Sequence, residues 1–321
     1  MTIEAFTYDD ILLMPSYNHW ESRRVVDLSI TDQSGKLQLD LPIMSANMDT
    51  ITESAMANFM AQKGGIGVLH RFMSIDQNVA EFKACHTPVF VSIGCGKPGL
   101  ERAQALAEAG ADKFCVDVAH AHARYIGQIL KNLRASCGAD IIKVGIGGGS
   151  VCTTRLKTGF GVPNLTAIKE CSRVDRSIVA DGGIRYPGDI VKALAFGADF
   201  VMIGSLLAGT TPTPGPVITK TQADGTVQHL KIYRGMASSE AADDYHGGLT
   251  EWKTAEGVST EIPFREDEDA ILADIIGGLR SGLTYGGAAS IKALQRKLDY
   301  VRVTPAGRTE RPASAKACAL R

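Results

Sequence analysis

One short phrase, repeated three times along the chain, constrains the fold more than any other feature of the sequence. In each copy a helix-like stretch ends in Gly-Ala-Asp and an apolar run follows, with the phrase at residues 110–112, 138–140 and 197–199. Glycine commonly ends an α-helix, and an apolar, β-branched run is typical of a buried strand. A repeated unit of helix, glycine and strand therefore predicts an α/β protein with a parallel sheet.

Short apolar runs bounded by glycine or proline give seven predicted strands, with amphipathic helices between them. The strands are expected at residues 43–48, 65–69, 89–94, 114–118, 141–147, 178–181 and 200–203. Three of the helices are expected at residues 53–62, 100–109 and 121–133. The count is seven strands, whereas a TIM-type (βα)8 barrel needs eight.

The pattern changes after the last predicted strand. Residues 210–263 are polar and weakly periodic. In a barrel, this segment would be a flap inserted after the last strand, on the catalytic face, and able to act as a mobile cover. Helices are expected again at residues 268–280 and 288–298, and a disordered tail at 305–321. Residues 1–304 are then one predicted domain, since α/β barrels reach about 250 residues as single units.

Composition and charge exclude several classes of partner. The 321 residues carry 34 Lys and Arg against 35 Asp and Glu, which gives no reason to expect nucleic acid or an anionic membrane surface. The most apolar stretch, residues 198–208, is too short to span a membrane. The N-terminus lacks a signal-peptide pattern. The seven cysteines are odd in number and lack the paired spacings of a metal site, so a reducing cytoplasm with free thiols is predicted.

The densest group of chemically useful residues is the segment 143–155, where a predicted strand runs into a glycine-rich loop. Glycines let the backbone approach a ligand closely, and Ser150 is placed to donate to a phosphate. Cys152 lies at the carboxyl end of the strand, where a barrel places its nucleophile. A free cysteine is more often an inert buried thiol, so both interpretations stay open on these grounds.

Two further glycine turns follow strands, at Asp181-Gly182-Gly183 and at Gly204-Ser205. Barrels commonly bind phosphate at the loops after their last two strands, so a phosphate pocket is predicted there. Asp181 is a candidate either to accept from ribose hydroxyls or to cap the next helix.

Two other patterns carry less weight. His120 and His122 alternate beside Asp117, but no third ligand is evident at a suitable spacing, so a metal centre is a minor alternative. A Rossmann-type fingerprint sought at residues 145–150 is rejected, because no helix opens there and no downstream acid follows.

Several motifs resemble those of the IMP dehydrogenase/GMP reductase family, from about Phe6 to Thr304. The most specific is Gly-x-Gly-Ser-x-Cys-x-Thr, which ends at Thr154, and the others lie at residues 42–50, 180–183, 233–236 and 277–281. The resemblance implies a (βα)8 barrel, a homotetramer, and attack of Cys152 on C2 of a purine nucleotide.

Within this family the sequence looks most like a GMP reductase. Residues 82–88 join the second and third predicted strands directly, with no regulatory domain, and Lys157-Thr158-Gly159 follows the cysteine loop as in reductases. Residues 251–264 resemble the reductase cover. Dehydrogenases carry an Arg-Tyr pair in the flap that activates the hydrolytic water, whereas the flap tyrosine here, Tyr245, follows an aspartate.

By this resemblance the chain converts GMP to IMP and ammonia with NADPH, through a covalent thioimidate on Cys152. Thr154 and Glu256 would shuttle the proton for the departure of ammonia, with Asp117 near the nicotinamide and the thiolate. The residues implied to bind substrate are Ser45, Met48, Ser150, Asp181, Gly183, Gly204, Ser205, Met236, Ala237 and Ser238. Those implied at the cofactor are Arg71, Asp117 and Trp252, and those implied at a K+ ion are the backbone carbonyls of Gly147, Gly149 and Cys152.

The largest departure from the family lies between Leu133 and Gly138. Relatives have a strand and a helix there, about 25–30 residues that make one central βα unit. This is the missing eighth strand, so two open sheet edges are predicted unless neighbours re-pair or a partner supplies a strand. Reductases also generally have lysine in place of Arg71.

Two alternatives to a reductase stay open. Dehydrogenase-like phrases at residues 64–67 and 70–74 favour an IMP dehydrogenase that converts IMP to XMP with NAD. The missing unit favours a catalytically impaired purine-nucleotide-binding homologue, which would bind GMP without turnover.

Overall fold

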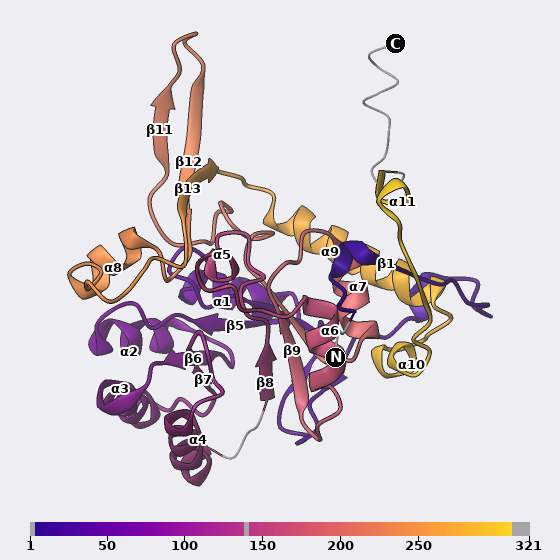
Figure 1. Cartoon of the computed structure of the whole chain (residues 1–321), viewed down its shortest axis with the longest axis horizontal. Helices are drawn as coiled ribbons and strands as arrows, with labels where there is room; N and C mark the ends of the chain where they lie inside the picture. The colour runs from indigo at the N-terminus through magenta and orange to yellow at the C-terminus, as the bar shows by residue number, and fades with distance from the viewer. Residues whose placement is uncertain (1–3, 138–140, 310–321) are drawn as a thin grey trace.

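The computed structural model describes residues 4–137 and 141–309, which form a curled sheet with helices around it (Figure 1). The sheet has seven parallel strands in the order β7-β6-β5-β4-β10-β9-β8. Their bounds are β4 (Ile43–Ser45), β5 (Ile66–Leu69), β6 (Phe90–Ile93), β7 (Phe114–Val116), β8 (Ile141–Val144), β9 (Ser177–Asp181) and β10 (Phe200–Ile203). Each strand overlaps the range predicted for it, so the parallel α/β class is confirmed.

The sheet is open at one place only among the described strands. Its edge strands, β7 and β8, follow each other along the chain. In a closed barrel each strand pairs with the next, and the first pairs with the last. Here the first and last strands, β4 and β10, do pair, with Val201 opposite Ile43. The opening thus lies between β7 and β8, where the sequence lacks one βα unit, and the prediction of an open barrel is confirmed.

Helices follow the strands, and one of them, α2 (Ile75–Ala84), begins at a serine that caps its first turn. The Ser74 hydroxyl accepts from the Gln77 amide at 3.1 Å, and the Gln77 side chain accepts from the Ser74 amide at 3.0 Å, which is a capping box. The helices are α1 (Ser54–Gln62), α2 (Ile75–Ala84), α3 (Gly96–Glu108), α4 (Arg124–Cys137), α5 (Thr154–Thr158), α6 (Asn164–Cys171), α7 (Pro187–Ala195), α9 (Glu268–Tyr285) and α10 (Ile291–Gln295). Helix α9 is longer than predicted, and α10 is shorter.

The core is densest on the side of the sheet away from the opening. Ile43 of β4 and Phe200 and Val201 of β10 are completely buried, together with Leu194 of α7 and Leu279 of α9. Full burial of a side chain of this size contributes about 1.5–3 kcal/mol. In contrast, all three residues of β7 are partly exposed. The joined side of the barrel is therefore better packed than its open edge.

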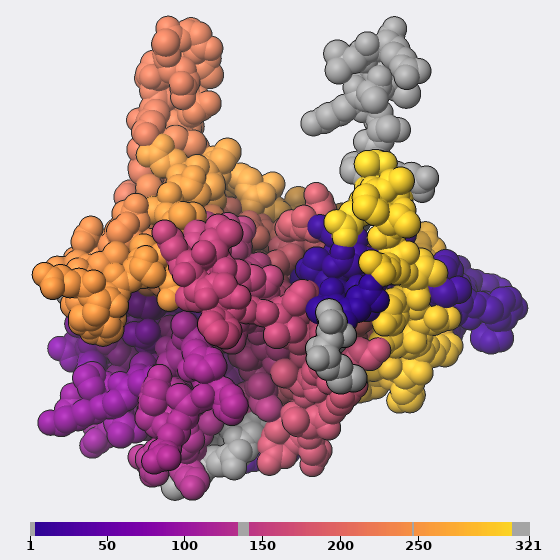
Figure 2. All heavy atoms as spheres, in the orientation of Figure 1, coloured from indigo at the N-terminus to yellow at the C-terminus, as the bar shows by residue number. Residues whose placement is uncertain are grey.

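The polar segment after β10 forms a small antiparallel sheet and a helix, which the sequence pattern did not indicate. These elements are β11 (Ile218–Thr221), β12 (Val227–Arg234), β13 (Ser259–Pro263) and α8 (Ser239–His246). Figures 1 and 2 show the β11–β12 hairpin projecting from the barrel. The outer part of the hairpin, residues 219–229, is exposed, so the apolar alternation that identifies strands is missing there. The insertion follows the last barrel strand, as predicted.

A buried lysine fixes the base of the flap. The Lys231 ammonium donates to the carbonyl oxygens of Thr210, Thr211 and Thr213 at 2.6–3.3 Å. Burial lowers the pKa of Lys231, and the carbonyl groups replace the water that the ammonium gives up. The flap is thus joined to the loop that follows β10.

The two ends of the chain pair with each other. Strand β1 (Ile11–Leu13) runs antiparallel to β14 (Tyr300–Arg302). The remaining elements are η1 (Tyr8–Asp10), η2 (Arg23–Val25), β2 (Ile30–Thr31), β3 (Gln38–Leu39) and α11 (Pro305–Thr309). Helix α11 takes up the start of the segment predicted to be disordered, and residues 310–321 lie outside the described residues. Within residues 4–137 and 141–309, no helix is long and apolar enough to cross a membrane.

The pH dependence of stability tests the packing at the open edge. Burial raises the pKa of the Cys115 thiol, on β7, from 9.0 to about 11. This contribution to stability is complete below pH 9 and is lost as the pH rises toward 11, because the unfolded thiol ionises first. We expect the wild type to lose roughly 2–3 kcal/mol over this interval that Cys115→Ala does not lose. Urea titrations at both ends of the interval measure the difference, and equal losses in the two proteins would contradict the prediction.

Candidate active site

The loop after β8 is shaped by glycines and carries Cys152. Gly145 has a φ of +146°, and a side-chain carbon there would lie 1.9 Å from the Asp181 carbonyl oxygen, so only glycine lets the loop approach β9. The Cys152 amide donates to the Gly149 carbonyl at 3.1 Å. The Cys152 thiol donates to the Thr154 hydroxyl at 3.2 Å. The loop therefore brings the predicted nucleophile and one member of the predicted proton shuttle into contact.

Two segments of the flap lie against this loop. The Val151 carbonyl accepts from the Val258 amide at 3.0 Å, and the Thr153 amide donates to the Glu256 carbonyl at 2.8 Å. Gly235 permits the approach, because a side-chain carbon there would lie 2.8 Å from the Val151 oxygen. Backbone contacts thus place Glu256 beside the cysteine loop, about one hundred positions away along the chain.

Met236, Ala237 and Ser238, which are predicted to face the purine base, follow Gly235 in the flap. The Met236 sulfur accepts from the Asp49 amide at 3.3 Å, and the Ala237 carbonyl accepts an amide of the cover segment at 2.9 Å. Ser238 is fully buried, and its hydroxyl accepts from the Ala241 amide at 3.2 Å, so it caps α8. Met236 and Ala237 are therefore available to a base, whereas the Ser238 hydroxyl already has a structural role.

Ser150 and the Gly204-Ser205 turn, which are predicted for a phosphate pocket, lie together, and Tyr233 joins them. The Ser150 and Tyr233 hydroxyl oxygens are 2.9 Å apart. A side-chain carbon at Gly204 would lie 3.5 Å from the Met48 sulfur and 3.8 Å from the Tyr233 oxygen. Ser205 donates to a backbone carbonyl of a neighbouring loop at 3.3 Å. Tyr233 was missed at the sequence level, although its place in the Tyr-Arg-Gly-Met motif could have indicated it.

Asn164 and Arg155 hold the glycine turns in place. Asn164 donates to the Gly182 carbonyl at 2.6 Å and accepts from Arg155 at 2.9 Å. A side-chain carbon at Gly183 would lie 3.2 Å from both the Asn164 nitrogen and the Gly148 oxygen. Neither supporting side chain was predicted, because only the folded chain brings these loops together.

Four charged side chains of alternating sign lie near the carboxyl ends of the strands. Arg71 donates to Asp117 at 3.1 Å, and Lys143 donates to Asp181 at 2.5 Å. Burial lowers the pKa of Lys143, but the charges of Asp181 and Asp117 and the hydrogen bond to Asp181 outweigh burial and raise that pKa overall. The structure thus brings together two of the predicted cofactor residues, and it pairs the predicted ribose acceptor with a lysine.

The positions of Ser45, Trp252 and the two histidines, His120 and His122, restrict the roles predicted for them. Ser45 is completely buried, and its hydroxyl accepts from Thr52 at 2.9 Å, so it stands behind the surface that a nucleotide can touch. Trp252 is 78% exposed on the flap. The rings of His120 and His122 are 6.3 Å apart, and within the described part of the chain no three His, Cys, Asp or Glu side chains gather to hold a metal ion.

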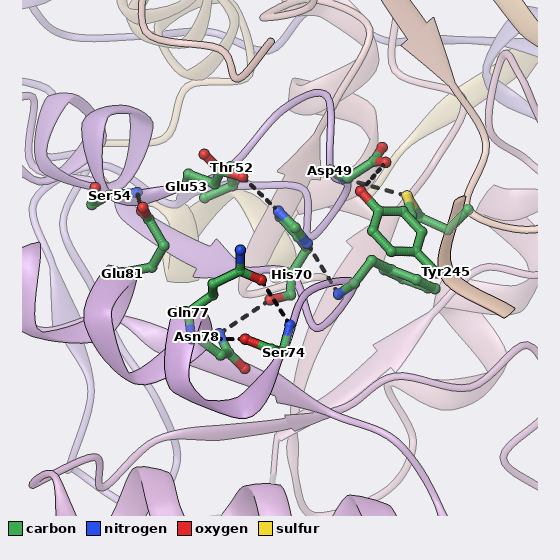
Figure 3. A network of polar contacts seen from close by, with 12 residues as sticks. Asp49, Thr52, Glu53, Ser54, His70, Ser74, Gln77, Asn78, Glu81 and Tyr245 are labelled. Carbon is green, nitrogen blue, oxygen red and sulfur yellow. Dashed lines mark hydrogen bonds and ion pairs between the residues drawn. The ribbon is translucent and has the colours of Figure 1, made fainter. Parts of the chain in front are cut away.

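An ionic cluster joins the flap to the barrel. Arg234, at the end of β12, donates to Asp49 at 2.6 and 3.0 Å and to Asp244 at 2.6 Å. Tyr245 donates to the same Asp49 oxygen at 3.0 Å, and its ring packs against Phe72 (Figure 3). Burial, together with the Asp49 charge, raises the pKa of Tyr245 to about 12. The Tyr245 hydroxyl therefore keeps its proton and acts as a donor.

A network of hydrogen bonds around His70, next to this ionic cluster, fixes the loop after β5 (Figure 3). His70 Nδ1 accepts from the Phe72 amide at 3.1 Å, and His70 Nε2 lies 3.0 Å from a Glu53 oxygen. Nδ1 thus carries no proton, and Nε2 donates to the carboxylate. Since Phe72 packs against Tyr245, the network links the flap to the loop that carries Arg71.

Comparison with known proteins identifies the family. The model of the IMP dehydrogenase / GMP reductase domain matches residues 5–137 and 135–313. The chain belongs to this family. The two matched pieces meet at residues 135–137, where the sequence lacks one βα unit.

Its relatives include both enzymes of the family. GMP reductase 1 of Mus musculus is 38% identical over 331 aligned residues, which cover 92% of this chain and 94% of the mouse protein. The crystal structure of the GMP reductase of Trypanosoma brucei in complex with guanosine 5′-monophosphate has a TM-score of 0.88 and 27% identity, covering 97% of this chain and 98% of that one. That of inosine 5′-monophosphate dehydrogenase from Legionella pneumophila has a TM-score of 0.84 and 64% identity, covering 95% and 100%.

Family membership establishes the class of chemistry. The fold is the TIM barrel of these structural relatives, with an opening between β7 and β8. The chain is an oxidoreductase of the class that acts on GMP or IMP with a nicotinamide cofactor. The alignment with the mouse enzyme is longer than this chain although it covers only 92% of it, so the mouse enzyme carries residues that this chain lacks.

Proposed function

We propose that the chain is a GMP reductase, which converts GMP to IMP and ammonia with NADPH. The observation that carries the proposal is the state of the flap tyrosine. Tyr245 donates to Asp49 and has a raised pKa, and residues 237–263 contain no arginine. The flap therefore has no arginine next to its tyrosine in the sequence. The arginine that lies over the Tyr245 ring, Arg234, is held by Asp49 and Asp244, so it is not free to help activate the hydrolytic water that a dehydrogenase needs.

The proposed chemistry begins at Cys152. Its thiol donates to Thr154, which gives the proton a path away from sulfur. The thiolate adds to C2 of GMP, and the bond from C2 to the amino nitrogen breaks as Thr154 and Glu256 deliver a proton to the departing ammonia. A nicotinamide cofactor, when bound, supplies the hydride that C2 then needs. The electron pair of the C2–S bond returns to Cys152 as IMP is released.

The binding roles follow from the same geometry. Ser150 and Tyr233, beside the Gly204-Ser205 turn and Gly183, would bind the phosphate through hydroxyl and backbone donors. Asp181 would accept from the ribose hydroxyls. Met48, Met236 and Ala237 would contact the base. The buried side chains of Ser45 and Ser238 would support these residues from behind and not contact the nucleotide.

The residues near the strand ends fit a nicotinamide cofactor. Arg71 and Asp117 form an ion pair, and 27% and 21% of their side chains are exposed. They therefore offer hydrogen-bond donors and acceptors to a carboxamide or a ribose. The exposed Trp252 ring is available for stacking. The choice of NADPH belongs to the reductase proposal. The Gly149 carbonyl already accepts from Cys152 but keeps a second lone pair, so a K+ ion at Gly147, Gly149 and Cys152 stays a proposal.

IMP dehydrogenase is the second candidate. The observation that favours it is the 64% identity to the Legionella pneumophila protein. It requires a base for the hydrolytic water other than an arginine and tyrosine adjacent in the flap sequence.

One pair of assays separates the two candidates. The purified protein is given GMP with NADPH, or IMP with NAD, and the products are identified by chromatography. We expect IMP and ammonia from the first mixture and negligible XMP from the second. Robust XMP formation would overturn the reductase proposal. GMP binding without turnover in either mixture would favour the impaired homologue.

The remaining expectations are also proposals. We propose a homotetramer in the cytoplasm, on the resemblance to the family and on the sequence composition. Residues 1–304 would form a single barrel domain. The small-molecule partner would be GMP or IMP.

A further inference from the structure

The Lys143–Asp181 pair lies beside the opening of the barrel. Lys143 is on β8, an edge strand, and stands opposite Val179 of β9. Asp181 is two residues further along β9, so both side chains point to the same face of the sheet. The Lys143 nitrogen lies 2.5 Å from Asp181 Oδ2, with 29% and 24% of the two side chains exposed. The pair therefore bridges the last two strands on one side of the opening.

The charges across the opening explain why a cation is needed there. Asp117, directly after the other edge strand, β7, also acts on the Lys143 charge. Arg71 neutralises Asp117 from one side at 3.1 Å. Lys143 thus balances Asp181 where two carboxylates would otherwise repel each other across the opening.

We propose that Lys143 is a positioning residue that holds Asp181 for the 2′-hydroxyl of a purine ribonucleotide, and so makes the site prefer ribose to 2′-deoxyribose. The inference rests on the proposed function, which assigns Asp181 to the ribose. The bond to Lys143 engages Oδ2 and so fixes the rotation of the carboxylate. The second oxygen then meets the ribose in one direction, which strengthens a hydrogen bond to a charged acceptor.

A merely structural role for Lys143 predicts different behaviour. If the pair only joined β8 to β9, its loss would destabilise the sheet and weaken every nucleotide alike. A positioning role instead affects only ligands that carry the 2′-hydroxyl. The ratio of the dissociation constants for 2′-deoxy-GMP and GMP therefore separates the two roles.

The test is calorimetric titration of the full-length protein with GMP and with 2′-deoxy-GMP. We expect Lys143→Met to weaken GMP binding by about tenfold and 2′-deoxy-GMP binding much less, so that the ratio falls. Lys143→Arg keeps the charge and the reach, and should restore most of the ratio. If Lys143→Met does not fold, Lys143→Gln tests the same loss of charge.

The matched control is Lys292→Met. Lys292 forms the same kind of pair, 2.5 Å from Asp199, but Asp199 precedes β10 and so lies at the opposite ends of the strands. We expect this variant to leave the ratio unchanged. An unchanged ratio in Lys143→Met, or equal weakening of both nucleotides, would overturn the inference and leave the proposed function standing. A wild type that binds neither nucleotide would overturn the proposed function itself.

Discussion

Cys152→Ala is expected to lower the turnover number for NADPH oxidation with GMP by at least about 10⁴-fold while GMP still binds. Under the proposed mechanism sulfur forms the only covalent bond to the substrate, so no neighbouring group can replace it. Cys152 shares a hydrogen bond with Thr154, and the loop that carries it is held by backbone contacts to the flap. Its removal should therefore leave the shape of the site intact. Steady-state kinetics and calorimetry with GMP measure the two effects.

A second cysteine near the same strand ends gives the control. Cys95 follows β6, and burial raises its thiol pKa. Cys95→Ala should change turnover by less than about threefold, because the proposal gives this thiol no contact with the substrate. Turnover that survives Cys152→Ala, or that disappears equally in both variants, would refute the assignment of the nucleophile.

The barrel could be predicted from the sequence because its signals are local. Each apolar run, such as 200–203, is bounded by the glycine turns that end a helix and begin a loop, and these turns need no distant partner to be recognised. The opening was predictable for the same reason, since seven such runs were counted and the family resemblance placed the gap before Gly138. The pairing of β4 with β10 confirms that the other strands keep barrel order.

The place of the flap in the chain was predicted, but its strands and helix and the contacts that support the site were not, because their partners are distant in sequence. Arg234 meets Asp49, and Tyr233 meets Ser150, only when the flap folds over the barrel. The exposed β11–β12 hairpin also lacks the apolar alternation of a half-buried strand. Ser45 is the converse case, since its motif was recognised from the sequence but its burial was not.

Replacing Arg234 should be the most destabilising single change at the site. The Asp49 side chain is 4% exposed and that of Arg234 is 12% exposed, so Arg234→Met leaves a buried carboxylate without its cation. We expect a loss of about 3–5 kcal/mol in the free energy of unfolding. Turnover should fall as well, because the cluster also anchors Tyr245 and the Met236 loop. Urea unfolding and steady-state kinetics measure both losses.

A double mutant and an exposed pair show whether the buried charge is the cause. Adding Asp49→Asn to Arg234→Met removes the stranded charge and should recover a substantial part of the lost stability. Arg173→Met breaks an ion pair of the same length, 2.6 Å to Glu170, whose side chains are 68% and 54% exposed, and should cost only about 1 kcal/mol or less. If the two arginine variants lose the same small amount, Arg234 does not anchor the flap. Another outcome is that only Arg234→Met loses turnover, and that adding Asp49→Asn restores stability but not turnover. The ion pair would then fix the position of the flap over the site as well as stabilise the fold.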